Sequence, residues 1–561
     1  MSRRQGRAGL RALVRSRRVG LLLSLVLVAG LASACGSRLS GHDAALAQGA
    51  LGARGSNAGN SGVGTGAPAL GADSGNCSSW GSGSAGSSTT TTTAAAGASK
   101  STTTTTAAKA SASSTTTTTA PCSSASLALS GGGSAAGGGA GGAGAHGTTG
   151  AAGAAAGPST AAAAAGAGPC GANGNAMPAG GNGGATAQGV TANTITVGNI
   201  ASISGVAPGL TQSAQQATQA WAAYVNSTGG ICGRQIKVQP FDDGNDSGTN
   251  YADAQQACSS DFAMVGNASG FDDGSAQAVG ACGIPDMAAE VSTAAAGGTA
   301  DIFGASPGND HYWALGPANY LKSTYGGAIS KAAMIYLNVS ATQTQAAHEV
   351  AAYQSVGFNY LENISTDPTN ANYGAIVQEL QSKGVQYVTE YSDDNSAERL
   401  LEAMQQANYA PQVVDWFSEE YSPEFAQQTA PESNGDLVLM SATAAYEEAS
   451  GNPGMQLMES WLNRVAPGYH HDIFAILAWS AGLAFEQAAK EVGPDLTRAA
   501  LISKLQGITN WTGDGVTPPV NIGQKIPSKC FFYMKIENGA FQRVYPTAPN
   551  TYDCNSGYFQ Y

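Results

Sequence analysis

The stretch of residues 194–244 constrains the fold of this chain most, because it combines two strand patterns with one helical pattern. A β-branched run at 195–200 predicts a strand, and apolar residues then recur at spacings of three and four over 211–225, which predicts an amphipathic helix. Gly229–Gly230 ends this helix, and a second strand runs to Asp242–Asp243. A strand, a helix and a strand in this order form a βαβ unit, which predicts a parallel sheet.

Alternating strand and helix patterns continue beyond this unit. A first series extends to about residue 305, and a second series runs over 332–441. Two long helices follow at 453–465 and 472–492, and Asn538–Gly539 predicts a hairpin turn near the carboxyl terminus. The pattern predicts an α/β fold with parallel sheets, and a folded part of about 370 residues exceeds one core and is long enough for two Rossmann-like lobes.

Short motifs in the opening unit resemble those of the type I periplasmic solute-binding proteins, in particular the leucine and branched-chain amino acid, amide and urea group of ABC transporters. In chain order they are Ser204-Gly205, Asn226, Gly229-Gly230-Ile231, Gly233-Arg234 and Asp242-Asp243. The resemblance covers about residues 189–561 and implies two lobes joined by a three-crossover hinge, with a cleft that closes on a ligand. It assigns residues 189–305 and 442–526 to lobe 1, and residues 306–441 and 527–561 to lobe 2.

Ligand-binding residues are expected in the loops at the carboxyl ends of the strands, where ligands of parallel sheets bind. The loop after the first strand contributes one serine. The resemblance to amino acid binders adds hydroxyls and backbone groups from lobe 1, and a tyrosine and an acid from lobe 2. The expected residues are Ser204, Ser269, Gly270, Ser292, Thr293, Tyr391, Ser392, Ser418 and Glu419.

The role and the ligand of these residues stay open at this point. Hydroxyls at helix starts also serve as helix caps. The match of lobe 2 is loose, since Ser418 stands where the family places the acid that pairs with an α-ammonium, and Glu419 follows one position later. An amino acid, an amide, a urea-like compound and a carboxylate all remain candidate solutes.

The first 34 residues have the pattern of a bacterial lipoprotein signal peptide. Residues 1–18 carry seven arginines and no acid, residues 19–31 are almost wholly apolar, and the sequence LASAC ends at Cys35. Lipidation of Cys35 would hold the protein at the cell membrane, on its extracytoplasmic face, and plain secretory cleavage is the alternative. The apolar run is too short for a comfortable membrane span.

Residues 35–188 consist mainly of Gly, Ala, Ser and Thr, with threonine runs at 89–93, 102–106 and 115–119. Such a composition has too few large apolar residues to offset chain entropy, so it predicts a disordered tether. A flexible coil of about 150 residues spans roughly 60–75 Å root-mean-square. The threonine runs are candidates for O-linked sugars.

The charge balance argues against nucleic acid as a partner. The chain has 25 basic and 38 acidic residues, and losing the seven arginines of the signal peptide leaves 18 against 38, a net charge of about −20. Phosphate binding needs clustered cations, which this sequence lacks.

The nine cysteines fit an oxidising compartment, because none has the CxxC spacing of a zinc or redox site. Cys258 and Cys282 end consecutive predicted helices that would pack side by side. This favours a Cys258–Cys282 disulfide, with Cys232 as a rival partner. A Cys530–Cys554 disulfide would fix the carboxyl terminus.

The motifs favour a binding protein over an enzyme. His348-Glu349 lacks the second histidine of a zinc protease helix, His470-His471-Asp472 lies at a predicted helix start, and the folded part has no P-loop. We expect no cofactor and no metal. The expected partners are a small polar solute, ABC permease subunits and, through the lipid anchor, the membrane, with the protein itself a monomer. The alternative is an extracellular ligand-sensing subunit of a signalling receptor.

Overall fold

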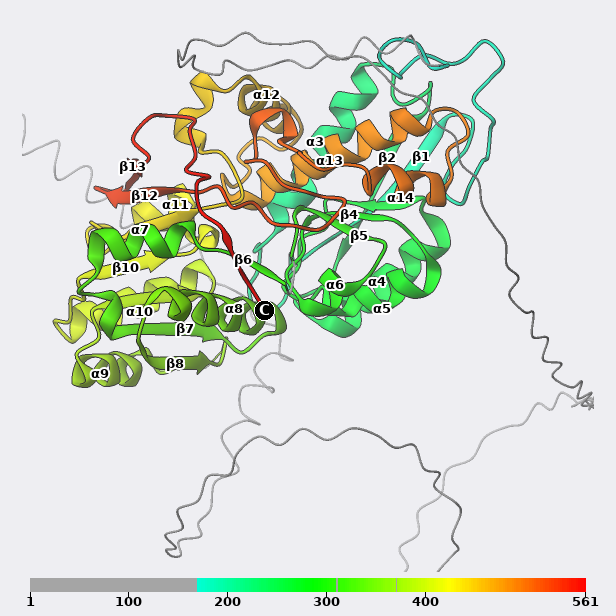
Figure 1. The fold of residues 1–561 in the computed structure, drawn as a ribbon. Coiled ribbons are helices and arrows are strands. Elements are labelled where there is room, and N and C mark those ends of the chain that lie inside the picture. Colours follow the sequence, from blue (N-terminus) through cyan, green and yellow to red (C-terminus); the bar gives the residue numbers. More distant parts are fainter. Residues whose placement is uncertain (1–168, 309–310, 370) are drawn as a thin grey trace, which may run out of the picture. The chain divides into compact units, whose positions relative to one another are not determined.

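The computed structural model describes residues 169–308, 311–369 and 371–561, which form two large β-sheets flanked by helices and a small two-stranded sheet (Figure 1). One large sheet lies in lobe 1 and the other in lobe 2. The predicted signal peptide, Cys35, the threonine runs and the tether up to residue 168 lie outside the described residues.

Lobe 1 is built on a five-stranded parallel sheet in the order β2-β1-β3-β4-β5. Ile195 and Val197 of β1 pack into the core on one face, and Ile200 packs into a separate core on the other. Both faces are therefore buried, as is usual for parallel sheets. The strands are β1 (Thr194–Ala201), β2 (Gln235–Asp242), β3 (Ala263–Val265), β4 (Asp286–Glu290) and β5 (Ile302–Ser306).

Helices cover both faces of this sheet. The lobe 1 helices are α3 (Gln212–Ser227), α4 (Ser247–Ser260), α5 (Asp273–Cys282), α6 (Ala294–Gly298), α12 (Pro453–Val465), α13 (Ile473–Val492) and α14 (Arg498–Leu505). On one face, α3 packs against α13, where Trp221 and Phe485 meet edge to face with their ring centroids 5.8 Å apart. On the other, α4 packs against α5. Helices α12 and α13 thus return to lobe 1 after the chain has built most of lobe 2, as the sequence predicts.

Lobe 2 is built on a seven-stranded sheet in the order β13-β12-β11-β10-β9-β7-β8. Its strands are β7 (Ala332–Leu337), β8 (Tyr360–Thr366), β9 (Tyr387–Tyr391), β10 (Val413–Trp416), β11 (Leu437–Met440), β12 (Phe532–Glu537) and β13 (Ala540–Tyr545). The strands are parallel except β12 and β13, an antiparallel hairpin turned by Asn538–Gly539. The helices are α7 (Gly316–Tyr325), α8 (Ser340–Val356), α9 (Tyr373–Lys383), α10 (Asp394–Gln406) and α11 (Pro423–Gln428).

The chain passes between the lobes three times, after β5, after β11 and before β12. The first connection contains β6 (Tyr312–Ala314), which pairs antiparallel with β14 (Tyr558–Gln560) at the carboxyl terminus. Short 3-10 helices complete the fold at η1 (Ile329–Lys331), η2 (Ser418–Glu420), η3 (Tyr446–Gly451) and η4 (Gly513–Gly515).

Three disulfides lie within the described residues. Two are the favoured pairs, Cys258–Cys282 and Cys530–Cys554. The third joins Cys170 to Cys232, so the rival pairing of Cys232 with Cys258 or Cys282 was wrong, and Cys170 does not belong to a free tether.

Residues 169–188 correct the expected start of the folded part. They pack against lobe 1, with Cys170 only 2% exposed and the N–H of Cys232 donating to Gly174 O over 2.9 Å. The guanidinium of Arg234, a fully buried side chain, donates to Gly184 O over 3.1 Å. A disulfide and backbone hydrogen bonds hold this segment against lobe 1, and large apolar side chains contribute little. Its composition therefore suggested disorder.

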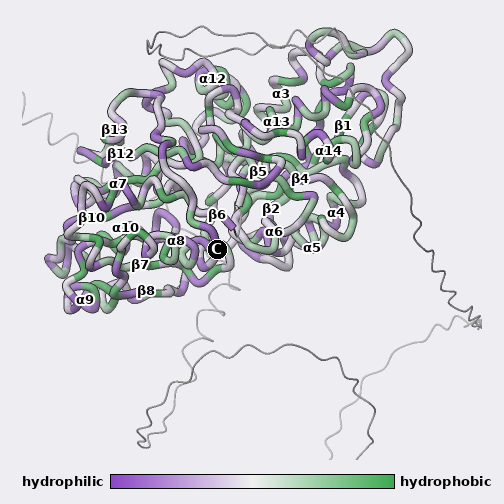
Figure 2. The backbone as a smooth tube through the Cα atoms, in the orientation of Figure 1, coloured by the Kyte–Doolittle hydropathy of each residue, from purple (hydrophilic) through white to green (hydrophobic). Residues whose placement is uncertain are grey.

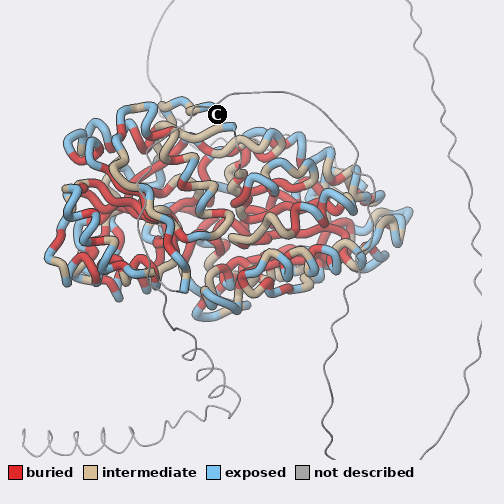
Figure 3. Tube along the Cα trace, turned by 90° about the horizontal axis from the view of Figure 1, so that it is seen from below, coloured by how far each residue is buried: buried red, intermediate tan, exposed pale blue. Residues whose placement is uncertain are grey.

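Apolar stretches follow the strands and inner helices (Figure 2), and buried segments run through both lobes beneath exposed outer turns (Figure 3). The most extensively buried helix is α13, which lies inside lobe 1. No helix in the described part of the chain combines the length and the apolar character that crossing a bilayer requires.

Candidate functional site

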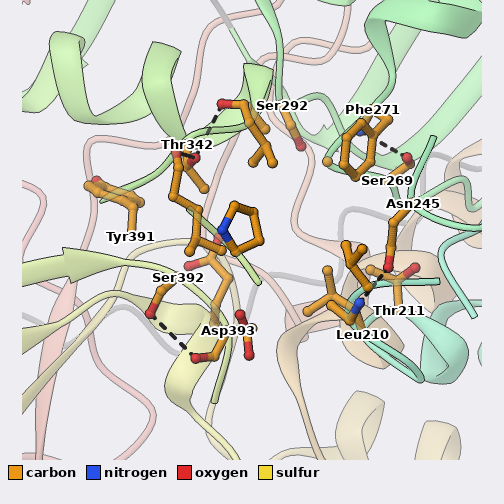
Figure 4. A pocket seen from close by; sticks show the side chains of 18 of the residues that line it. Leu210, Thr211, Asn245, Ser269, Phe271, Ser292, Thr342, Tyr391, Ser392 and Asp393 are labelled. Carbon is orange, nitrogen blue, oxygen red and sulfur yellow. Dashed lines mark hydrogen bonds between the residues drawn. The ribbon is translucent and has the colours of Figure 1, made fainter. Parts of the chain in front are cut away.

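A cavity between the two lobes, here called the interlobe cavity, takes its walls from both (Figure 4). It encloses about 90 Å³. Lobe 1 contributes the loops after β1 to β4, and lobe 2 contributes α8 and the segments after β7, β8, β9 and β10. Of the residues expected from the sequence, the cavity brings together Ser269, Gly270, Ser292, Tyr391, Ser392 and Glu419.

Three of the expected residues do not line this cavity. Ser204 is exposed, and its N–H donates to Asp242 Oδ1 over 3.0 Å. Ser418 is 2% exposed and begins η2. The hydroxyl of Thr293 accepts from the N–H of Ala296 over 3.3 Å, so this residue caps α6. The alternative role weighed for the loop hydroxyls, helix capping, is therefore present at Thr293.

The loops after β1 and β2 form one rim of the interlobe cavity. Val206 and Leu210 supply apolar surface. Asn245 is 8% exposed, and its side-chain Oδ1 accepts from the N–H of Ala207 over 2.8 Å. Its Nδ2 atom is buried without a hydrogen-bond partner in the described part of the chain. Asn245 therefore lines the cavity and carries a buried donor that is not used within the described part of the chain.

The hydroxyl of Ser269 already has an acceptor within lobe 1. It donates to the carboxylate of Asp243, and it accepts from the N–H of Phe271 over 3.0 Å. The Asp243 side chain is fully buried and also accepts from Asn250 Nδ2 over 3.0 Å. This hydroxyl proton is thus engaged by a carboxylate of the protein itself.

The loop after β4 also donates a hydrogen bond to a carboxyl group of lobe 1. The N–H of Ser292 donates to Asp272 Oδ2 over 2.8 Å. Burial raises the pKa of Asp272 to about 7, although hydrogen bonds from the Ser292 loop oppose this shift. The Ser269 hydroxyl and the Ser292 N–H therefore already bind internal carboxyl groups.

Tyr391 forms part of the lobe 2 wall. Its hydroxyl donates to Glu349 Oε2 over 2.8 Å, and its ring lies against Phe417, with the centroids 4.6 Å apart. Burial raises the pKa of Glu349 to about 8, so this carboxyl group is protonated near neutral pH. Asp393 also lines the cavity and caps α10, since its carboxylate accepts from the N–H groups of Asn395 and Ser396.

Two carboxyl groups reach the interlobe cavity from opposite lobes. Glu290 ends β4 in lobe 1, and Glu419 lies in η2 of lobe 2. Burial, and then the neighbouring Asp272, raise the pKa of Glu290 to about 7. Burial and the charge of Glu290 raise the pKa of Glu419 well above its usual range, and Glu419 Oε2 has no hydrogen-bond partner in the described part of the chain. The two acids therefore oppose each other's ionisation across the cleft.

A second cavity of about 130 Å³, here called the hinge-side cavity, adjoins the first. The two share the lining residues Glu290, Ser292 and Gln345. The hinge-side cavity is lined by segments of all three connections between the lobes and by Thr293 and Phe417. In the described part of the chain, neither cavity is lined by Lys or Arg.

Several lining residues were missed from the sequence. The apolar wall comes from residues on four separate segments, namely Val206, Leu210, Phe271, Leu337, Val339 and Phe474. Phe271 follows Ser269 by two positions, so the loop after β3 carried a signal for an aromatic contact. No local sequence signal indicated Phe474, because this residue belongs to α13, which lies more than 200 residues further along the chain than Phe271.

The sequence matches the family model described as periplasmic binding protein over residues 194–540. Among solved structures, the chain is similar to a fatty acid ABC transporter substrate-binding protein from Thermomonospora curvata, with 18% identity, 65% of this chain and 97% of the other covered, and a TM-score of 0.56. It is also similar to the branched-chain amino acid transporter substrate-binding protein LivJ from Streptococcus pneumoniae in complex with isoleucine (16% identity; 63% and 99% covered; TM-score 0.54).

A third similar structure is an ABC transporter solute-binding protein from R. palustris in complex with benzoate (15% identity; 64% and 97% covered; TM-score 0.53). No curated protein sequence matches the chain. The family match spans most of the folded part, so this chain belongs to the periplasmic binding protein family, with the type I fold of the binding proteins of branched-chain amino acid ABC transporters. The predictions of family and fold class are confirmed. Members of this family are substrate-binding proteins and not enzymes.

Proposed function

We propose that this protein is the lipid-anchored, extracytoplasmic solute-binding component of an ABC importer. It captures a small polar solute between its lobes and delivers it to the permease subunits. The observation that carries this proposal is the interlobe cavity, whose walls come from both lobes, so that a bound solute would hold the lobes together.

The solute-binding step predicts stabilisation by ligand. A solute at one hundred times its Kd adds about 2.7 kcal/mol to the free energy of unfolding, because it binds the folded chain alone. The experiment is a thermal melt of the mature, full-length protein with amino acids, amides, urea and short carboxylic acids, each at millimolar concentration. At least one compound should raise the Tm by several degrees. If every class of compound leaves the Tm unchanged, the protein does not bind small solutes of these kinds.

The anchoring step is tested separately at Cys35, the expected lipidation site. A Cys35→Ser variant should move from the membrane fraction to the soluble fraction, because the thioether that carries the lipid cannot form. Mass spectrometry of the mature wild-type protein should show an amino-terminal Cys35 with acyl chains. An unmodified mature protein that begins at or near residue 35 would contradict lipidation and leave secretion.

A further inference from the structure

The lobe 1 side of the interlobe cavity is poorly suited to a carboxylate. The Ser269 hydroxyl donates to Asp243, and the Ser292 N–H donates to Asp272, so both donors are satisfied by internal carboxyl groups. A solute carboxylate placed there would lie near Asp243, Asp272 and Glu290. It would gain no compensating cation, because no lining residue in the described part of the chain is Lys or Arg. Charges of the same sign disfavour such binding strongly in a site that excludes water.

The acids Glu290 and Glu419 instead favour a positive charge. They reach one cavity from opposite lobes, and Glu419 Oε2 has no hydrogen-bond partner in the described residues. A group with several N–H donors placed between them would satisfy these oxygens and remove the repulsion between the lobes. The described residues contain no group of three or more His, Cys, Asp or Glu side chains that could hold a metal ion. The charge is therefore better supplied by an organic nitrogen.

Asn245 favours a solute that carries a neutral hydrogen-bond acceptor. Asn245 lines the lobe 1 side, which Figure 4 shows opposite Tyr391 and Ser392, and its Nδ2 is a buried donor that no group in the described part of the chain satisfies. A buried donor without an acceptor is costly, so a ligand oxygen at this place gains binding energy. That oxygen must be neutral, because the nearby Asp243 would repel an anion. The remaining surface is apolar, which suits an aliphatic or aromatic body.

We propose that the solute is an organic cation without a carboxylate, with an ammonium group between Glu290 and Glu419, a neutral oxygen that accepts from Asn245, and an apolar body. This inference rests on the proposed function and narrows its solute class. Amino amides and amino alcohols have this chemistry, whereas free amino acids and carboxylic acids do not.

Two matched sets of four compounds test the inference, because each set varies the ammonium and the carboxylate independently. The first set is leucinamide, leucine, 4-methylpentanamide and 4-methylpentanoate, and the second set is the corresponding four compounds that carry a benzyl side chain. Binding to the mature, full-length protein is measured at pH 7 by calorimetry and by thermal melts. We expect an amino amide to bind at least about tenfold more tightly than its amino acid or its uncharged amide, and the carboxylates not to bind.

Two isosteric variants locate the ammonium. Glu290→Gln and Glu419→Gln should each weaken amino amide binding by about tenfold or more, and the unliganded variants should melt at or above the wild-type temperature, because each removes a buried acid whose ionisation is disfavoured. Glu402→Gln, which changes an exposed acid on α10 of lobe 2, is the matched control and should leave binding unchanged.

The outcomes separate the inference from the proposed function. Tighter binding of an amino acid or a carboxylate than of the amino amide, or amino amide binding that neither glutamine variant weakens, would overturn the organic cation while the solute-binding function stands. If no compound of any charge class binds, the solute-binding function fails and the inference fails with it.

Discussion

The charges of two single residues, Glu290 and Glu419, affect the closing of the cleft. Each belongs to a different lobe, and each disfavours ionisation of the other. The other titratable groups near the pair are Asp272, Glu420 and Asp393, which are also acidic, and His348 of α8 in the hinge-side cavity. Burial therefore favours the protonated form of both acids in the empty protein, and a bound cation would favour their ionised form.

Because a bound cation would displace protons from Glu290 and Glu419, we expect its affinity to increase as the pH rises. A cation favours the ionised carboxylates, so binding releases protons, and at pH 5 these protons must be displaced at a free-energy cost. Between pH 5 and pH 7 leucinamide keeps its charge, and its affinity should rise by about tenfold. Calorimetry in two buffers with different ionisation enthalpies measures the released protons. Affinity that is constant or falls over this range would contradict the role of the acid pair.

Glu349 predicts an opposite trend for the stability of the empty protein. Burial raises its pKa to about 8 in the folded chain, while in the unfolded chain it titrates near its ordinary value of 4.5. Because the folded state holds the proton more tightly, stability is greatest at low pH and falls as the pH rises from about 5 to 8, by on the order of 3–4 kcal/mol.

Urea unfolding at several pH values measures this effect. Glu349→Gln should flatten the pH profile, since glutamine does not titrate, whereas the exposed acid Glu402 can be changed to Gln with little effect. Stability that increases from pH 5 to 8 in the wild-type protein would show that buried acids such as Glu349 do not dominate its titration.

Among the elements, α13 depends most on close packing, because it fills the space between α3 and the lobe 1 sheet. Gly482 of α13 faces the ring of Trp221, and a Cβ atom at this position would collide with that ring. Gly482→Ala should lower the free energy of unfolding by about 1–3 kcal/mol, although alanine is the better helix former.

Gly280 of α5 provides the matched control for this substitution. It is exposed, and an added Cβ would meet Thr299 Cγ2 at 3.6 Å, an ordinary contact. Gly280→Ala should therefore stabilise the protein by about 0.5–1 kcal/mol. Urea unfolding of both variants tests the argument, which fails if Gly482→Ala is as stable as Gly280→Ala.

The sequence predicts those elements whose signals are local. The strand, helix and glycine signals over 194–244 predict β1, α3 and β2, and the apolar patterns at 453–465 and 472–492 predict α12 and α13. The partners of the loop residues depend on distant segments, and so they were not predictable. Ser269 was expected to meet the ligand, but whether its hydroxyl is free depends on Asp243, which lies in another loop.

At the scale of the whole molecule, the Cys170–Cys232 disulfide fixes the place where the amino-terminal region joins lobe 1. It closes a loop between residues that are 62 positions apart, and removing such a cross-link costs about 2–4 kcal/mol. A Cys170→Ser/Cys232→Ser double variant should lose this stability and become sensitive to protease within residues 169–188.

Limited proteolysis followed by mass spectrometry measures this exposure. A Cys530→Ser/Cys554→Ser double variant is the matched control, because it removes a disulfide at the other end of the folded chain. Residues 169–188 should stay protected in that control. Equal cleavage of this segment in both double variants would mean that its packing does not depend on Cys170.

The pairing of β14 with β6 has a practical consequence for engineering this protein. The last residue, Tyr561, donates its N–H to His311 O over 3.3 Å, beside the first connection between the lobes. A fluorescent reporter or purification tag fused after Tyr561 would crowd a segment that must twist when the lobes close. A biosensor should therefore carry its fusion before residue 169 and have nothing attached after Tyr561.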